Sequence, residues 1–83
     1  MTALPVVRVE WDDSTQIIRW LRRDEIVECE VKHCVSVGFL LHEDERQVWL
    51  VQSDDQDASD DDRHFNNALA IPKVAITKRE TIP

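Results

Sequence analysis

The chain has 83 residues and carries 17 acidic against 10 basic side chains, a net charge of −7. This length suits a single domain over residues 1–83, whose one core buries only roughly 60 to 65% of the unfolded surface. With 42% hydrophobic residues the chain is too apolar to be disordered throughout. Its negative charge makes nonspecific nucleic-acid binding unfavourable, because such binding depends on Lys and Arg. No segment approaches the ~20 apolar residues that span a bilayer, so we expect no membrane contact.

The first predicted strand covers Leu4 to Trp11, a short β-branched run with Pro5 at its start, which favours an edge strand. After it, Asp13 or Ser14 is a suitable cap for a short helix from Thr15 to Arg23. An irregular turn anchored by Trp20 is the alternative, because two helical turns are marginal without tertiary packing.

The strongest periodic signal runs from Val27 to Leu41, where every second residue is apolar or His33. Fifteen alternating residues exceed a typical strand of about five or six, so the element must bend or break. Gly38, the only glycine, favours a bend within the strand. The polar step at residues 32–34 is the alternative, dividing the run into two strands. The alternation also places His33 on the inward face, as a hydrogen-bonded histidine at the edge of the core.

A hairpin is predicted next, in which the polar residues 42–46 connect Val37–Leu41 to Gln47–Gln52. Within the second strand, Val48 to Val51 is apolar on both faces. Such a run indicates either a central strand covered on both sides or a partly exposed contact face. We favour partial exposure of this strand at an oligomer or ligand surface.

Residues 53–67 are predicted to form a mobile acidic loop, because they lack an apolar period and glycine. Two short strands, Ala68–Ile71 and Val74–Ile82, then flank a tight turn at Pro72. The fold predicted from these elements is mainly β: a small, bent, five-stranded antiparallel barrel of the Sm-like or SH3-like kind, with one short helix or turn after the first strand.

The acidic loop holds six aspartates opposed by a single arginine: Asp54, Asp55, Asp57, Asp60, Asp61 and Asp62. An EF-hand needs a central glycine and a glutamate at its twelfth position. Counted from Asp55, those places hold Asp60 and Asn66, so calcium is not expected. A solvated loop is the simpler interpretation, and mimicry of DNA phosphates toward a basic protein is the alternative.

Cysteine and histidine spacing does not indicate a metal site. Cys29 and Cys34 are separated by an odd number of positions on one predicted strand, so they should face opposite sides and not pair. No Cys-x-x-Cys pair or zinc-finger spacing is present. We therefore expect a reducing compartment, no metal and no cofactor.

Catalytic motifs are also missing from the sequence. It contains no Gly-x-Ser-x-Gly elbow, and one glycine cannot build a phosphate-binding loop. Asp12, Asp13 and Ser14 have acid-base chemistry, but these residue types also suit a corner after a strand. The sequence favours a binding protein over an enzyme.

Several short motifs resemble those of small proteins encoded by tailed bacteriophages, a group largely without assigned function. They are Trp-Asp-Asp-Ser-Thr at residues 11–15, Trp20, Ser-Val-Gly-Phe-Leu at 36–40 and Ile-Pro-Lys at 71–73, with Ile76. Arg19 departs from the group, where a glycine would be expected before Trp20. The resemblance implies a phage-encoded accessory protein in the host cytoplasm that acts on a host factor, as an anti-defence inhibitor or by sequestering a small anionic ligand.

The expected partners are a host protein or small ligand and further copies of the chain. An Sm-like RNA-binding protein and a DNA-mimicking inhibitor are the alternatives. Candidate binding residues combine the first-strand corner with aromatic and polar side chains elsewhere: Trp11, Asp12, Asp13, Ser14, Thr15, Trp20, Ser36, Trp49 and Lys73.

Overall fold

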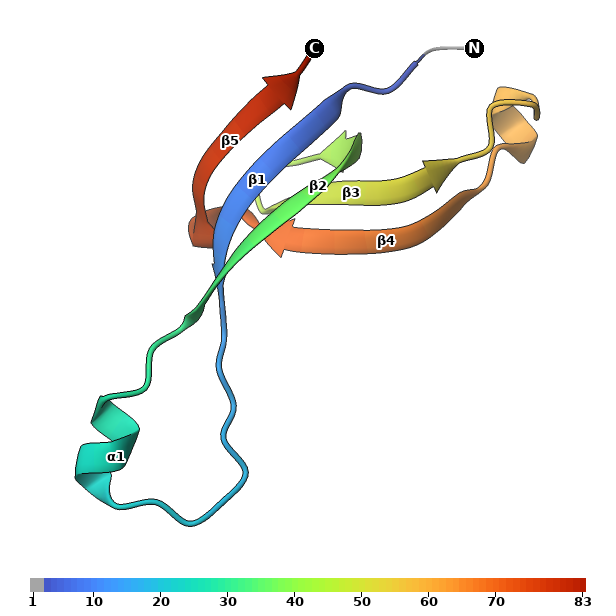
Figure 1. Ribbon diagram of the computed structural model, residues 1–83. Coiled ribbons are helices and arrows are strands. Elements are labelled where there is room, and N and C mark those ends of the chain that lie inside the picture. The colour runs from blue at the N-terminus through green and yellow to red at the C-terminus, as the bar shows by residue number, and fades with distance from the viewer. Residues whose placement is uncertain (1–2) are drawn as a thin grey trace.

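The computed structural model describes residues 3–83, which form one antiparallel sheet in the order β4-β3-β2-β1-β5 (Figure 1). The five strands are β1 (Val6–Asp13), β2 (Lys32–Glu43), β3 (Gln47–Asp54), β4 (Phe65–Pro72) and β5 (Ile76–Ile82). Three short helical segments connect them: α1 (Arg23–Val27), η1 (Asp60–Asp62) and η2 (Lys73–Ala75). The mainly β, five-stranded antiparallel prediction is confirmed. Within the described chain β4 and β5 are the two edges and the sheet is not closed, so the barrel remains a prediction.

Alternation along β1 decides which face of the sheet is buried. Val7, Val9 and Trp11 lie on one face and are buried, whereas the residues between them are only partly covered. β1 lies between β2 and β5, with Val6 opposite Phe39 on one side and Ile82 on the other. The first predicted strand is therefore correct in kind and lies two residues further along the chain, but its predicted place at a sheet edge is wrong because β1 is paired on both sides.

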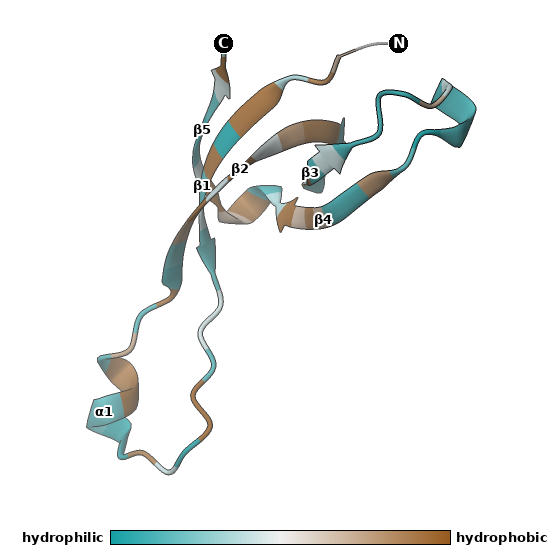
Figure 2. Cartoon of the chain, turned by 45° about the vertical axis from the view of Figure 1, so that its right-hand side comes forward, coloured by the Kyte–Doolittle hydropathy of each residue, from teal (hydrophilic) through white to brown (hydrophobic). Residues whose placement is uncertain are grey.

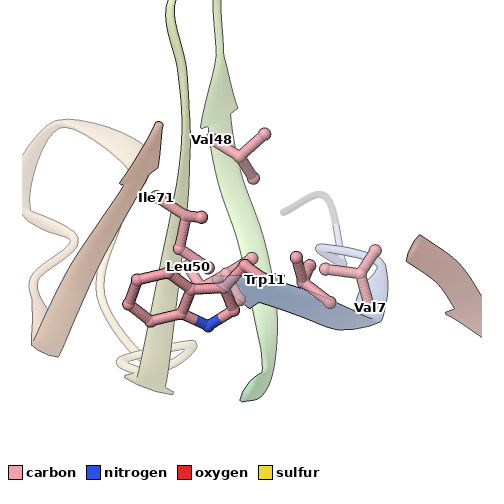
Figure 3. Close-up of a cluster of buried hydrophobic side chains, with 6 residues drawn as sticks. Val7, Trp11, Val48, Leu50 and Ile71 are labelled. Carbon is pink, nitrogen blue, oxygen red and sulfur yellow. The ribbon is translucent and has the colours of Figure 1, made fainter. Parts of the chain in front are cut away.

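The core is a small cluster from three strands (Figure 3). It consists of Val7, Val9, Trp11, Val48, Leu50 and Ile71, with Cys34, Leu40 and Ile76 packed against it. Val51 is also buried, so three of the four residues Val48 to Val51 are covered in a strand between β2 and β4. The position of β3 in the middle of the sheet thus explains most of this apolar run, rather than the exposed contact face that was favoured. Only Trp49 is partly exposed.

β2 changes partners along its length, which is how it accommodates twelve residues. Its first part pairs with β1, and its pairing with β3 begins at Phe39. Gly38 lies at the change, and a Cβ atom there would be 3.0 Å from the carbonyl oxygen of Val51. The register with β3 then shifts between Leu40 and His42, a bulge that increases the local bend. The predicted bend near Gly38 fits this geometry, and the predicted division at residues 32–34 is wrong because β2 is continuous.

The predictions for residues 15–31 are corrected by the structure. No helix forms over Thr15–Arg23; that segment is extended or bent up to Arg22, and α1 begins only at Arg23. Strand structure begins at Lys32, so the alternating run has no strand character over residues 27–31. Both differences have one cause: these residues lie beyond the paired part of β1 and β2, where no other element covers them.

The second half of the chain follows the predictions more closely. The hairpin between β2 and β3 is confirmed, with Asp44 to Arg46 as its connection. β3 extends to Asp54 and β4 begins at Phe65, so both ends of the predicted loop 53–67 are strand. Pro72 ends β4, and the short helix η2 then leads into β5.

The molecule is elongated because its two hairpins diverge. One consists of β3 and β4 and ends in the acidic loop, and the other continues β1 and β2 into a projecting arm that carries α1 (Figure 1). The extents are 55 × 24 × 22 Å and the radius of gyration is 16.7 Å. A compact chain of this length would have a radius of gyration of about 12 Å. Much of the chain therefore lies outside the packed sheet.

Candidate interaction surfaces

Trp11 and Ser36, two of the predicted binding residues, meet on the buried face of the sheet. Trp11 is 9% exposed, and its indole Nε1 donates a hydrogen bond of 3.0 Å to the Ser36 hydroxyl. Buried indoles require such an acceptor for their one polar group. The bond joins β1 to β2 and gives both side chains a structural role.

The corner that follows β1 holds the base of the arm together. The backbone N–H of Ser14 donates to Asp13 Oδ1 over 2.8 Å. The Thr15 hydroxyl donates to the carbonyl oxygen of Glu30 over 2.7 Å and so bridges the two sides of the arm. These contacts use the polar groups of the corner within the chain itself.

His33 lies between two carboxylates near this base, on the exposed face of the sheet rather than the inward face that was predicted. Its Nδ1 is 2.8 Å from Asp12 Oδ1, and its Nε2 is 3.4 Å from Glu10 Oε1. Hydrogen bonding to Asp12 and then Glu10 raises the pKa of His33, while Arg8 and His33 lower the pKa of Glu10. Sequence reasoning missed this cluster, although Glu10 and Asp12 are two residues apart and must share a face of β1.

Lys73 is engaged in an ion-pair cluster at the opposite end of β2. Its Nζ lies 2.7 Å from Glu43 Oε2, and the guanidinium of Arg79 donates to both oxygens of the same carboxylate over 2.9 and 3.0 Å. Arg79 and then Lys73 lower the pKa of Glu43 to about 2. The cluster ties β2, η2 and β5 together, so an anionic ligand would have to compete with Glu43 for Lys73.

One of the six aspartates in the acidic segment is structural and five face solvent. Asp54 accepts hydrogen bonds from Arg63, which lowers the pKa of Asp54, and the Arg63 guanidinium lies 5.4 Å from the centre of the Phe65 ring. The remaining five are exposed: Asp55, Asp57, Asp60, Asp61 and Asp62. The end of the β3–β4 hairpin is thus strongly negative, and Figure 2 shows it as hydrophilic (teal).

A cavity of about 390 Å³, here called the notch, lies where the two hairpins separate. Residues 32–38 of β2 pair with β1, but among residues 3–83 no strand pairs with their other side. From Ser53 onward, β3 likewise pairs only with β4. The notch presents polar and apolar surface in nearly equal amounts, and its lining is Ser36, Val37, Leu50, Val51, Gln52, Asn67, Ala68 and Leu69.

The arm, residues 14–31, is the second open surface. Trp20 is 101% exposed and Ile18 88% exposed. Figure 2 shows that the arm projects away from the sheet. A cavity of about 350 Å³ lies within the arm between its extended segment and α1, lined by apolar side chains that include Ile17, Leu21 and Ile26. The helix has five residues and begins where the backbone N–H of Arg22 donates to Glu25. Trp20 was among the candidate binding residues predicted from the sequence. The alternative to a helix there, a turn anchored by Trp20, does not agree with the exposure of this side chain.

The nine predicted binding residues are distributed over separate parts of the molecule. Trp11 is in the core, the Asp12 to Thr15 corner is at the base of the arm, and Trp20 is near its end. Ser36 lines the notch, Trp49 is half-buried in β3, and Lys73 lies beside Glu43. They do not converge on one site.

The structure defines a mainly β protein with two open surfaces, the notch and the arm. No protein-family model, curated protein or solved structure matches the chain. Among residues 3–83, no helix has the length and apolar character needed to cross a membrane. In the same residues no three His, Cys, Asp or Glu side chains are grouped so that they could hold a metal ion.

Proposed function

We propose that this is a phage-encoded accessory protein that binds a host protein, and that the notch receives an extended segment of that partner. The observation that carries the proposal is the free side of β2 over residues 32–38. A strand edge with unpaired N–H and C=O groups can accept another strand, and flanking pockets then select its side chains. The phage-like motifs support the source.

The notch has the composition that such a site needs. Val37 is 57% exposed at the β2 side and Leu69 is exposed on β4, so these two side chains supply apolar surface, above the buried Val51 of β3. Gln52 and Asn67 form part of the polar rim and are hydrogen-bonded to each other. A strand added to β2 would cover Val37 and place alternate side chains toward this lining. The engagement of Lys73 by Glu43 favours a protein partner over a small anion.

We also propose that the five strands form a bent barrel of the Sm-like or SH3-like kind when the protein is assembled. The support is the connected antiparallel order with β4 and β5 as its two edges, together with the sharp change of partner at Gly38. Closing a sheet removes such edges.

The test is affinity purification from the infected host, followed by hydrogen exchange on the recovered complex. We expect residues 32–38 of β2 to become protected when the partner binds, and Val37→Lys to weaken binding at least tenfold. Val74→Lys is the matched control, because Val74 is 99% exposed on η2, outside the notch. Unchanged exchange in β2 together with full binding by Val37→Lys would refute the proposal. Recovery of a bound small molecule without protein would favour sequestration of a ligand.

A further inference from the structure

The arm exposes a large apolar surface, and keeping this surface in water has a free-energy cost. Besides Ile18 and Trp20, the side chains of Val27 and Val31 are largely exposed. A fully exposed tryptophan alone presents roughly 150–250 Å². Together with the neighbouring side chains, the exposed apolar area of the arm is of the same order as the ~800 Å² that each partner contributes to a standard protein interface.

The arm also has little to hold it in place. Helix α1 has only five residues, and so short a helix is marginal in water without packing. Beyond the bond from Thr15 to Glu30, the described backbone contacts of the arm are local, from Ile26 to Arg22 and from Cys29 to Ile26. An ordered arm of this kind needs a surface to pack on.

The charge at the tip of the arm indicates which surface the arm packs on. Residues 16–23 contain Arg19, Arg22 and Arg23 and no carboxylate, so the tip of the arm carries a local charge of +3. Arg22 pairs with Asp24 and Glu25, whereas Arg19 and Arg23 form no ion pair within residues 3–83. The tip is therefore both apolar and cationic in a chain whose net charge is −7.

The complement of this tip lies on the same chain, at the end of the other hairpin. Five exposed aspartates there are opposed only by Arg63, which is already bonded to Asp54. In one copy the two hairpins diverge, so the tip does not lie on its own acidic loop (Figure 1). A second copy related by a two-fold axis would satisfy both ends at once, because each tip meets the other copy's loop.

We propose that the arm docks on the β3–β4 hairpin of a second copy, and that the exchange is reciprocal and closes a dimer. Ile18 and Trp20 supply the apolar contact, while the arginines of the tip face the aspartates of the partner's loop. Because the contact is symmetric, it closes at two copies. The dimer is independent of the proposed function, since the arm and the notch are different surfaces.

The experiment measures the mass of the purified chain by light scattering and sedimentation, up to about 100 µM, a range that detects dimers with micromolar dissociation constants. The wild-type chain should be a dimer whose dissociation constant rises with salt. Trp20→Ala should weaken the dimer at least tenfold, and Val74→Lys, which changes an equally exposed residue outside the arm, should leave it unchanged.

A charge exchange makes the test specific for the proposed pairing. One variant carries glutamate in place of Arg19, Arg22 and Arg23, and the other carries lysine in place of Asp57, Asp60 and Asp61. Each variant alone should be monomeric, because its tip and loop have like charges. Mixed in equal amounts they should form a heterodimer, in which both contacts again join opposite charges.

Three outcomes would overturn the proposal: a monomeric wild-type chain, dimers of either charge variant alone, or no heterodimer in the mixture. A monomer whose tip bound vesicles of anionic lipid would instead assign the arm to a membrane surface. Circular dichroism of each variant confirms that the sheet is folded, so a loss of mass cannot be attributed to unfolding.

Discussion

The β1–β2 hairpin passes through two environments, the five-stranded sheet and the arm. In the sheet, β1 has a strand on each side, and Val9 is completely buried. A few residues further along, the chain has left its neighbours, and Ile18 and Trp20 are almost fully exposed. Both segments are rich in apolar residues. The comparison shows that burial in this small protein depends on flanking strands, and that the arm must find its own cover elsewhere.

The largest expected difference in stability is the one between substitutions of two tryptophans, Trp11 in the sheet and Trp20 in the arm. Trp11→Ala removes a buried side chain and should cost about 3–5 kcal/mol of unfolding free energy. Trp20→Ala should change the stability of the monomer by less than about 0.5 kcal/mol. Urea denaturation, at concentrations where the chain is monomeric, measures both.

If Trp11→Ala does not fold, Trp11→Phe gives the same test with a smaller change, because it keeps an aromatic ring, although a smaller one, and loses the hydrogen bond to Ser36. Equal losses for substitutions at Trp11 and Trp20 would show that the arm is packed within the monomer.

Gly38→Ala should have the next largest effect. The added Cβ would be 3.0 Å from the Val51 carbonyl oxygen and 3.3 Å from Leu50 Cβ, and a paired backbone moves little. We expect a loss of about 1–3 kcal/mol, typical of overpacking. Ser14→Ala on the exposed arm is the control and should change stability by less than about 0.5 kcal/mol. A neutral Gly38→Ala would mean that β2 is free to bend at another residue.

The ion-pair cluster of Glu43 should contribute to the acid sensitivity of the sheet. Because the pKa of Glu43 is lowered to about 2 in the folded chain, its contribution is present above the ordinary pKa near 4.5 and is lost as the pH falls toward 2. Glu43→Gln should therefore flatten the decline in stability over this range. Glu45→Gln, which removes a nearby exposed carboxylate, should leave the decline unchanged.

The smallest effect should come from His33 at the base of the arm. Its pKa is raised by Asp12 and then Glu10, so its stabilising contribution is present below about 6.5 and is lost as the pH rises through the raised value. NMR titration should give His33 a pKa above its ordinary value, and the protection of amides near Asp12, relative to their intrinsic exchange rates, should fall above that pKa. A titration of His33 at or below its ordinary value would contradict the bridged geometry.

Much of the sheet could be predicted from the sequence because its signals are local and agree with one another. The polar residues at 42–46, the alternation around Val35 and Pro72 each define a turn or strand without knowledge of distant contacts. These elements were found close to their predicted positions, but the inward face predicted for β2 is wrong: Cys34 and Leu40 pack on the core, whereas Val35 and Val37 are exposed. Their pairing order depends on contacts between distant residues, which no local pattern specifies.

The structure of the arm could not be predicted, because its apolar periodicity would produce a helix or a strand only if neighbouring elements packed against it. Ile17, Trp20 and Leu21 have helical spacing, yet they lie beyond Asp13, the last residue of β1 that pairs with β2, so no strand of the sheet lies beside them within residues 3–83. Strand alternation from Val27 similarly fails before Lys32, beyond the last residue of β1 that pairs with β2. The candidate site residues were dispersed for a related reason: residue type shows which side chains suit binding, but not which ones the core or an ion pair already uses.

The pairing of β1 with β5 has a consequence for biosynthesis. Val6 lies opposite Ile82, so β1 lacks one of its two neighbours until β5 has been synthesised and has left the ribosome. Pairing across such a long separation is slow compared with hairpin formation. Until then the nascent chain would carry a strand with one unpaired side next to an apolar arm, and chaperone binding would shield both.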